Sequence, residues 1–78
     1  MNRDKVRNII ETTLKAGSRS PGLFDISKAL AIKTALEKSN SIPQVVEVIN
    51  TNNSTISRIF GVPMSAIERC ITDIEATA

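Results

Sequence analysis

The stretch that decides the fold is ISRIFGVPMSAIERCITDI, residues 56–74. Apolar residues recur at helical spacing on both sides of a break at Gly61 and Pro63. Glycine ends helices readily because it accepts left-handed backbone, and proline suits the first turn of the helix that follows. We therefore expect two short helices joined by a tight turn, over about residues 53–60 and 63–76.

The rest of the chain has the same helical spacing, although its many isoleucines would suit strands on propensity alone. Asn2 is the expected N-cap of the first helix and Gly17 its stop. The sequence predicts one small all-α domain over residues 1–78, with a C-terminal tri-helical part like a helix-turn-helix. Its five short helices are expected at about residues 3–16, 25–38, 43–49, 53–60 and 63–76.

The composition argues against several kinds of site. The 78-residue chain has no His, Trp or Tyr, and Cys70 is its single cysteine. One cysteine cannot form an internal disulfide, and without histidine the chain lacks a common zinc ligand and the usual catalytic base. The eight acidic residues are scattered, with no pair spaced for acid–base work. We therefore expect no enzyme activity, metal or cofactor, and a buried structural role for Cys70.

The charge is unevenly distributed along the chain. The net +2 divides into +4 over residues 1–38 and −2 over residues 39–78. No apolar run is long enough to cross a membrane, and the first residues do not resemble an export signal. An unpaired cysteine suits a reducing compartment, so a cytoplasmic location is expected. Because so small a chain has a thin core, association into a homodimer is also expected.

A weak eleven-residue repeat within residues 48–70 predicts two helix-turn-helix arrangements that overlap in the sequence. In the first, a helix ends at Asn50, and residues 53–60 form the helix that reads DNA. In the second, the turn is at Gly61, Val62 fills the gap between the helices, and residues 63–76 read DNA.

Both arrangements bring the start of the 53–60 helix to the DNA. Asparagine pairs with adenine and arginine with guanine, and a helix N-terminus binds phosphate. The candidate DNA-binding residues are Asn52, Asn53, Ser54, Thr55, Ser57, Arg58, Ser65 and Arg69.

Two segments resemble known DNA-binding families. STISR, residues 54–58, resembles the recognition helices of many bacterial repressors. Residues 56–74 resemble the helix-turn-helix of LuxR-type response regulators. These resemblances imply a transcriptional regulator that binds double-stranded DNA as a dimer. The chain departs from the pattern at Val46 and Asn50 in the first arrangement, where a small residue and a glycine are usual, and at Glu68 in the second.

The alternative is a helical protein-interaction module, such as a small inhibitor or accessory subunit, that does not bind DNA. The negative charge of residues 39–78 favours it, because DNA affinity depends on cations near the phosphates. DNA binding would be helped if Arg19, Lys28, Lys33 or Lys38 packed beside the motif.

Overall fold

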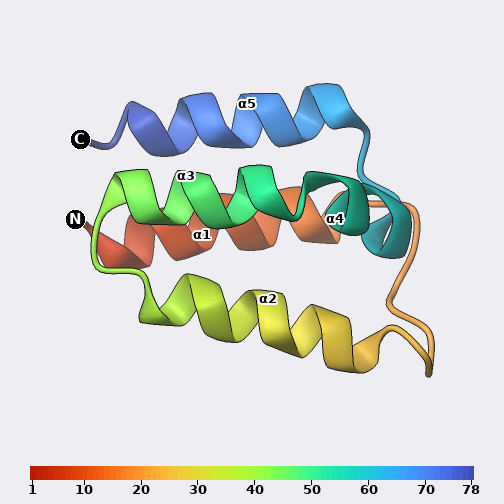
Figure 1. Ribbon diagram of the computed structural model, residues 1–78. Coiled ribbons are helices and arrows are strands. Elements are labelled where there is room, and N and C mark those ends of the chain that lie inside the picture. The colour runs from red at the N-terminus through yellow and green to blue at the C-terminus, as the bar shows by residue number, and fades with distance from the viewer.

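Five α-helices and no strand form the structure, a computed structural model that describes residues 1–78 (Figure 1). The helices are α1 (Arg3–Lys15), α2 (Ile26–Lys38), α3 (Ile42–Thr51), α4 (Asn53–Phe60) and α5 (Met64–Glu75). The predicted all-α fold with five short helices is confirmed. None of these helices combines the length and the apolar character that crossing a bilayer requires.

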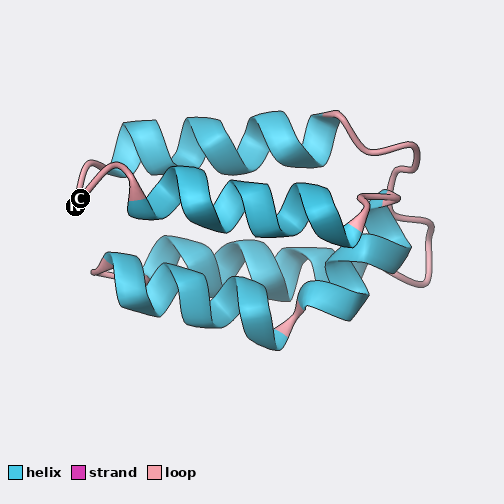
Figure 2. Ribbon diagram, turned by 90° about the horizontal axis from the view of Figure 1, so that it is seen from above, coloured by secondary structure: helices cyan, strands magenta, loops and turns pink.

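The four longer helices run roughly alongside one another, and the short α4 lies at the end where α3 leads towards α5 (Figure 1). Helix α5 packs on α1, α3 and α4, and from above it lies between α1 and α3 (Figure 2). Helix α2 packs on α3, on the side of the molecule away from α5 (Figure 1). The longer helices alternate in direction, as in an up-and-down four-helix bundle, but α1 and α2 do not pack closely on each other.

An aliphatic core holds the bundle together. Its members are Val6, Ala29, Ile32, Val45, Ile49, Ile56, Ile59, Phe60, Val62, Ile67, Cys70 and Ile74. Ile74 of α5 and Val45 of α3 have 0% and 1% of their surface exposed. The buried residues of α5 follow one another at steps of three and four, so they form one stripe that faces its neighbours.

Side chains cap two of the helices. The Asn2 side chain accepts a hydrogen bond from the Lys5 amide (3.1 Å), and the Ser41 hydroxyl accepts one from the Gln44 amide (3.4 Å). Each bond satisfies an amide that the first turn of a helix leaves free. Helix α2 has no such side-chain cap. Its start is stabilised instead by the Gly22 carbonyl, which accepts hydrogen bonds from the backbone amides of Asp25 and Ile26.

The turn expected at Asn50 is not formed. Helix α3 continues through Thr51, and Asn50 does not have a positive φ. The helix holds together because Val45 and Ile49 are buried in the core and because the Asn52 side-chain amide donates to the Val48 carbonyl (2.8 Å). Packing therefore outweighs the local preference of asparagine for turns, and the break between α3 and α4 lies at Asn52 instead of Asn50.

Gly17 has a different role from the predicted helix stop. Helix α1 ends on Ala16 with right-handed backbone, and Gly17 does not have a positive φ. A Cβ atom at Gly17 would instead collide with the Phe60 carbonyl. Glycine is needed here because the chain after α1 passes directly against the end of α4.

Candidate nucleic-acid interface

A three-residue turn, Gly61 to Pro63, joins α4 to α5. Gly61 has the predicted left-handed backbone, with φ 63° and ψ 39°. The Val62 amide donates to the Ser57 carbonyl (3.2 Å), and the Pro63 carbonyl accepts from the Ile67 amide (3.1 Å). The turn thus ends one helix and starts the next with its backbone groups hydrogen-bonded.

Most apolar residues of the second arrangement face the interior, whereas Met64 at the start of α5 is 43% exposed. Val62, in the middle of the turn, is 2% exposed. Ile56 and Phe60 of α4 and Ile67 and Cys70 of α5 are buried with it. Because both helices turn their apolar sides to this core, their polar sides are left free to meet a ligand.

The loop that follows α1 holds this turn in place. The Ser18 amide donates to the Gly61 carbonyl (3.2 Å), and the Arg19 amide donates to the Phe60 carbonyl (3.1 Å). A Cβ atom at Gly61 would collide with the Ser18 hydroxyl. We call this contact of residues 17–19 with residues 60–62 the clasp. It joins the basic N-terminal half of the chain to the turn.

The clasp adds a cation that the candidate set did not contain. The Arg19 guanidinium donates to the Arg58 carbonyl (3.3 Å), so two arginines from distant parts of the sequence come together. Arg19 lies in a Ser-, Pro- and Gly-rich connection, and nothing in its local sequence shows where the connection runs. Lys28, Lys33 and Lys38 belong to α2, which lies away from α5, so they do not assist this surface.

The exposed surface of α5 mixes one cation with three carboxylates. Its exposed residues are Met64, Ser65, Glu68, Arg69, Thr72, Asp73 and Glu75. Ser65, Glu68, Arg69 and Thr72 share one side of the helix, opposite the buried stripe. The Thr72 hydroxyl donates to the Glu68 carbonyl (3.1 Å), within the helix. This face therefore offers hydroxyl and guanidinium donors beside acidic groups that repel phosphate.

The candidate residues before and within α4 divide into two groups. Ser54 and Arg58 are exposed, whereas Asn52, Asn53, Thr55 and Ser57 are half-buried. Asn52 forms the junction of α3 and α4, where its side-chain amide is already bonded to Val48. The Asn53 side-chain oxygen accepts from the Ser54 hydroxyl (3.3 Å). Asn52 is therefore a structural residue rather than part of an outward base-reading face.

Arg58 also forms the only ion pair of the structure. Its guanidinium lies 3.4 Å from the Asp25 carboxylate, at the entry to α2, and the two side chains are 53% and 27% exposed. A pair this exposed contributes at most about 1 kcal/mol to stability. The pair fixes the position of Arg58 but reduces its net charge towards a phosphate.

Cys70 has the predicted buried position. Burial raises the pKa of its thiol above the ordinary value of 9.0, a hydrogen bond with Thr13 opposes that rise, and the nearby Asp73 carboxylate adds to it. The thiol is therefore protonated at neutral pH and poorly placed to act as a nucleophile. No three side chains of the His, Cys, Asp and Glu types come together as metal ligands would.

The comparisons with known proteins add no family to this description. No protein-family model, no curated protein and no solved structure matches the chain.

Proposed function

We propose that the chain binds double-stranded DNA through α5 and the turn before it, and acts as a transcriptional regulator in the form of a homodimer. The observation that carries the proposal is the turn itself. A left-handed glycine at position 61, a buried valine after it and apolar residues on the inner sides of both helices are the requirements of a DNA-binding helix-turn-helix.

In this proposal α5 lies in the major groove. Ser65 and Thr72 face base edges, Arg69 contacts a phosphate, and the start of α4 approaches another phosphate with Ser54. Arg58 also contacts a phosphate, as does Arg19, whose guanidinium donates to the Arg58 backbone carbonyl. A dimer is part of the proposal because one module of this size rarely binds DNA tightly enough alone.

The salt dependence of binding to random duplex DNA tests the proposal. With Arg19, Arg58 and Arg69 on phosphates, log K should fall against log salt with a slope of about −2.7 per chain, between about 50 and about 200 mM salt. Arg69→Ala should make the slope shallower by about 0.9. Lys38→Ala, which removes the same charge from α2, should leave the slope unchanged.

Two of the exposed carboxylates of α5 provide a test in which DNA affinity should rise rather than fall. If α5 contacts DNA, replacing Glu68 and Asp73 with Gln and Asn should tighten binding, because both repel phosphate at that face. A chain that shows no salt-dependent binding, or that binds equally well with and without Arg69, does not use this surface for DNA.

The second candidate is a protein-interaction module without DNA binding. The observation that favours it is the three exposed carboxylates of α5, which outnumber Arg69 and leave its exposed surface with a net negative charge. This candidate predicts no DNA binding at low salt, together with a stable complex with a protein.

A further inference from the structure

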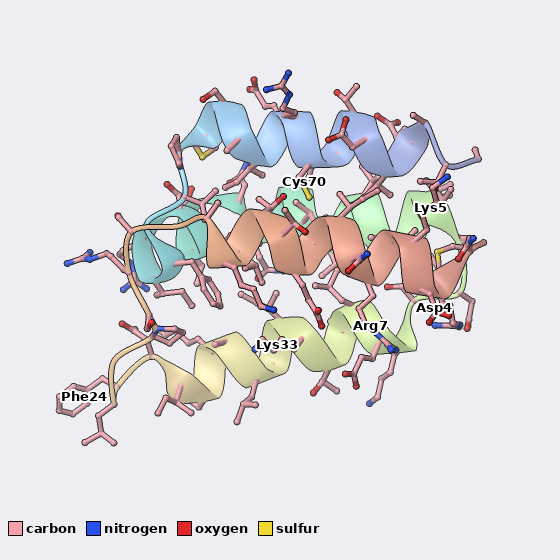
Figure 3. The ribbon with its side chains drawn as sticks, turned by 180° about the vertical axis from the view of Figure 1, so that it is seen from behind. Asp4, Lys5, Arg7, Phe24, Lys33 and Cys70 are labelled. Atoms are coloured by element: carbon pink, nitrogen blue, oxygen red, sulfur yellow. The ribbon has the colours of Figure 1, made fainter.

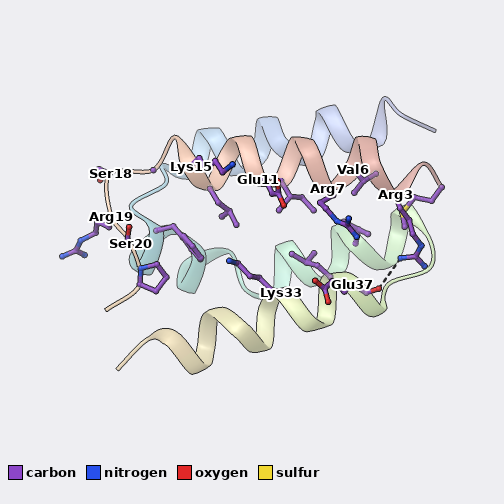
Figure 4. Close-up of a pocket in the computed structure, with 18 residues that line it drawn as sticks. Arg3, Val6, Arg7, Glu11, Lys15, Ser18, Arg19, Ser20, Lys33 and Glu37 are labelled. Atoms are coloured by element: carbon purple, nitrogen blue, oxygen red, sulfur yellow. Dashed lines mark hydrogen bonds between the residues drawn. The ribbon is translucent and has the colours of Figure 1, made fainter. Parts of the chain in front are cut away.

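One pair of neighbouring helices in the bundle, α1 and α2, is not closely packed. Helix α1 packs on α5, α5 on α3 and α3 on α2. Between α1 and α2 lies a groove of about 740 Å³ (Figure 4). A volume of this size is typical of a ligand site. The groove lies along α1 from Arg3 to Lys15, about 20 Å of helix at 1.5 Å per residue.

The floor of the groove is apolar. Val6, Ile10 and Leu14 line it from α1 at steps of four residues, and Leu36 lines it from α2. Phe60 lines it from α4. Below it is a smaller apolar cavity of about 20 Å³, which reaches Cys70 in the core. A helix laid on this floor would meet a row of aliphatic side chains at helical spacing.

Helix α2 continues this apolar surface into the solvent. Lys33 and Glu37 line the groove, and Leu30 and Ile26 lie on the same side of the helix, about one and two turns before Lys33. Ile26 is 46% exposed and Leu30 is 57% exposed. The chain covers only about half of the surface of each, so two aliphatic side chains lie next to the groove in partial contact with water.

The sides of the groove are mainly basic. Five lining residues are basic and two are acidic: Arg3, Arg7, Lys15, Arg19 and Lys33 against Glu11 and Glu37. Since the one ion pair of the structure joins Arg58 to Asp25, the cations of the groove have no carboxylate partner in the chain. Arg7 and Lys33 both extend towards the space between α1 and α2 (Figures 3 and 4).

The two ends of the groove differ. Arg3 closes one end by donating to the Glu37 carbonyl (3.3 Å) and to the Asn40 side chain (2.9 Å), across from α1 to the end of α2. At the other end the loop carries Leu23 and Phe24, which are 83% and 92% exposed. Phe24 projects away from the bundle (Figure 3). The groove therefore has one closed end, one open side and an apolar entrance for a ligand.

We propose that this groove binds an amphipathic helix of a partner protein, with its apolar side on the floor and carboxylates along its flanks. The cations lie along the whole length of the groove, which suits carboxylates repeated along a helix. A fatty acid carries one carboxylate at one end and would leave most of them unpaired. A nucleic acid would leave the apolar floor uncovered. The groove shares Arg19 and one end of α4 with the DNA-binding face, but its floor and most of its cations belong to α1 and α2, so the proposal holds whether or not α5 binds DNA.

Two designed helical peptides with the same leucine stripe test the proposal. One carries glutamate on both flanks, the other carries lysine, and binding of each to the full chain is followed by fluorescence anisotropy. The glutamate peptide should bind at least about tenfold more tightly, a difference of about 1.4 kcal/mol. Charge reversal by Arg7→Glu with Lys33→Glu should invert this preference. The matched pair Lys5→Glu with Lys28→Glu, on the same helices but outside the groove, should not.

The apolar part of the site is tested separately. Leu30→Gln should weaken binding of the glutamate peptide severalfold, while circular dichroism shows a folded chain, because Leu30 contributes little to the core. Equal binding of both peptides, or no binding of either, would overturn the proposal. So would sedimentation showing a dimer that Leu30→Gln dissociates, since the groove would then belong to a second copy.

Discussion

The two sides of this bundle are packed very differently. Helix α5 packs on α1, α3 and α4, and its Ile74 is completely buried. Helix α3 is the only helix on which α2 packs closely. The side chains of Ile26 and Leu30 on α2 are about half exposed. The comparison shows that one small core buries the apolar residues of one side, while the other side leaves apolar surface exposed.

The largest expected effect compares one buried and one exposed aliphatic residue. Ile74→Ala should lower the free energy of unfolding by about 2–5 kcal/mol, because it leaves a cavity at the centre of the bundle. Leu30→Ala should change it by less than about 0.5 kcal/mol, because Leu30 is 57% exposed. Urea unfolding followed by circular dichroism measures both.

If Ile74→Ala does not fold, Ile74→Val replaces it, with an expected loss of about 0.5–1.5 kcal/mol. A loss for Leu30→Ala as large as that for Ile74→Val would mean that α2 is buried in solution, and the contrast between the two sides would disappear.

A smaller effect is expected at the clasp. Gly61→Ala should cost about 1–2 kcal/mol from left-handed backbone alone, and the collision with Ser18 adds to it. Gly22→Ala is the control, because no atom lies near the position of its Cβ and its φ is not positive. The control should be neutral or stabilising by up to about 1 kcal/mol. Thermal unfolding should therefore show a loss of stability for Gly61→Ala and none for Gly22→Ala, and equal losses would show that Gly61 does not have left-handed backbone packed against Ser18.

The smallest effect concerns the pH dependence of stability. Burial raises the pKa of the Cys70 thiol, so the folded chain holds its proton more tightly than the unfolded chain does. The resulting stabilisation is fully present below the pKa of the unfolded thiol and is lost as the pH rises through the folded pKa. Between neutral pH and about pH 10, the native chain should lose more stability than Cys70→Ala does. An equal loss in both chains would show that the thiol is not buried.

Local signals in the sequence were enough to predict the helices and the α4–α5 turn. Asn2 and Gly61 act through their own backbone and nearest neighbours, so their roles are visible in the sequence. Asn50 was misleading because its turn preference is local, whereas the burial of Val45 and Ile49 on one side of α3 depends on tertiary packing.

The arrangement of the helices was not predictable in the same way. Arg19 reaches the turn only because α1 packs on α5, and the groove exists only because α1 and α2 do not pack on each other. Neither of these packing arrangements produces a repeating pattern of residues in the sequence. The sequence does show Leu23, Phe24, Ile26 and Leu30 as apolar residues around one helix start, but only the structure shows how much of their surface stays exposed.

The clasp has a consequence for the order of folding. It joins residues that are 43 positions apart, as in the contact of Ser18 with Gly61, whereas α3, α4 and α5 are neighbours in the chain. Contacts between sequence neighbours form first, because closing a long loop costs entropy before any contact offsets it. We expect the three C-terminal helices to form the nucleus and α1 to dock on it later, with Gly17 and Gly61 leaving the space for that late step.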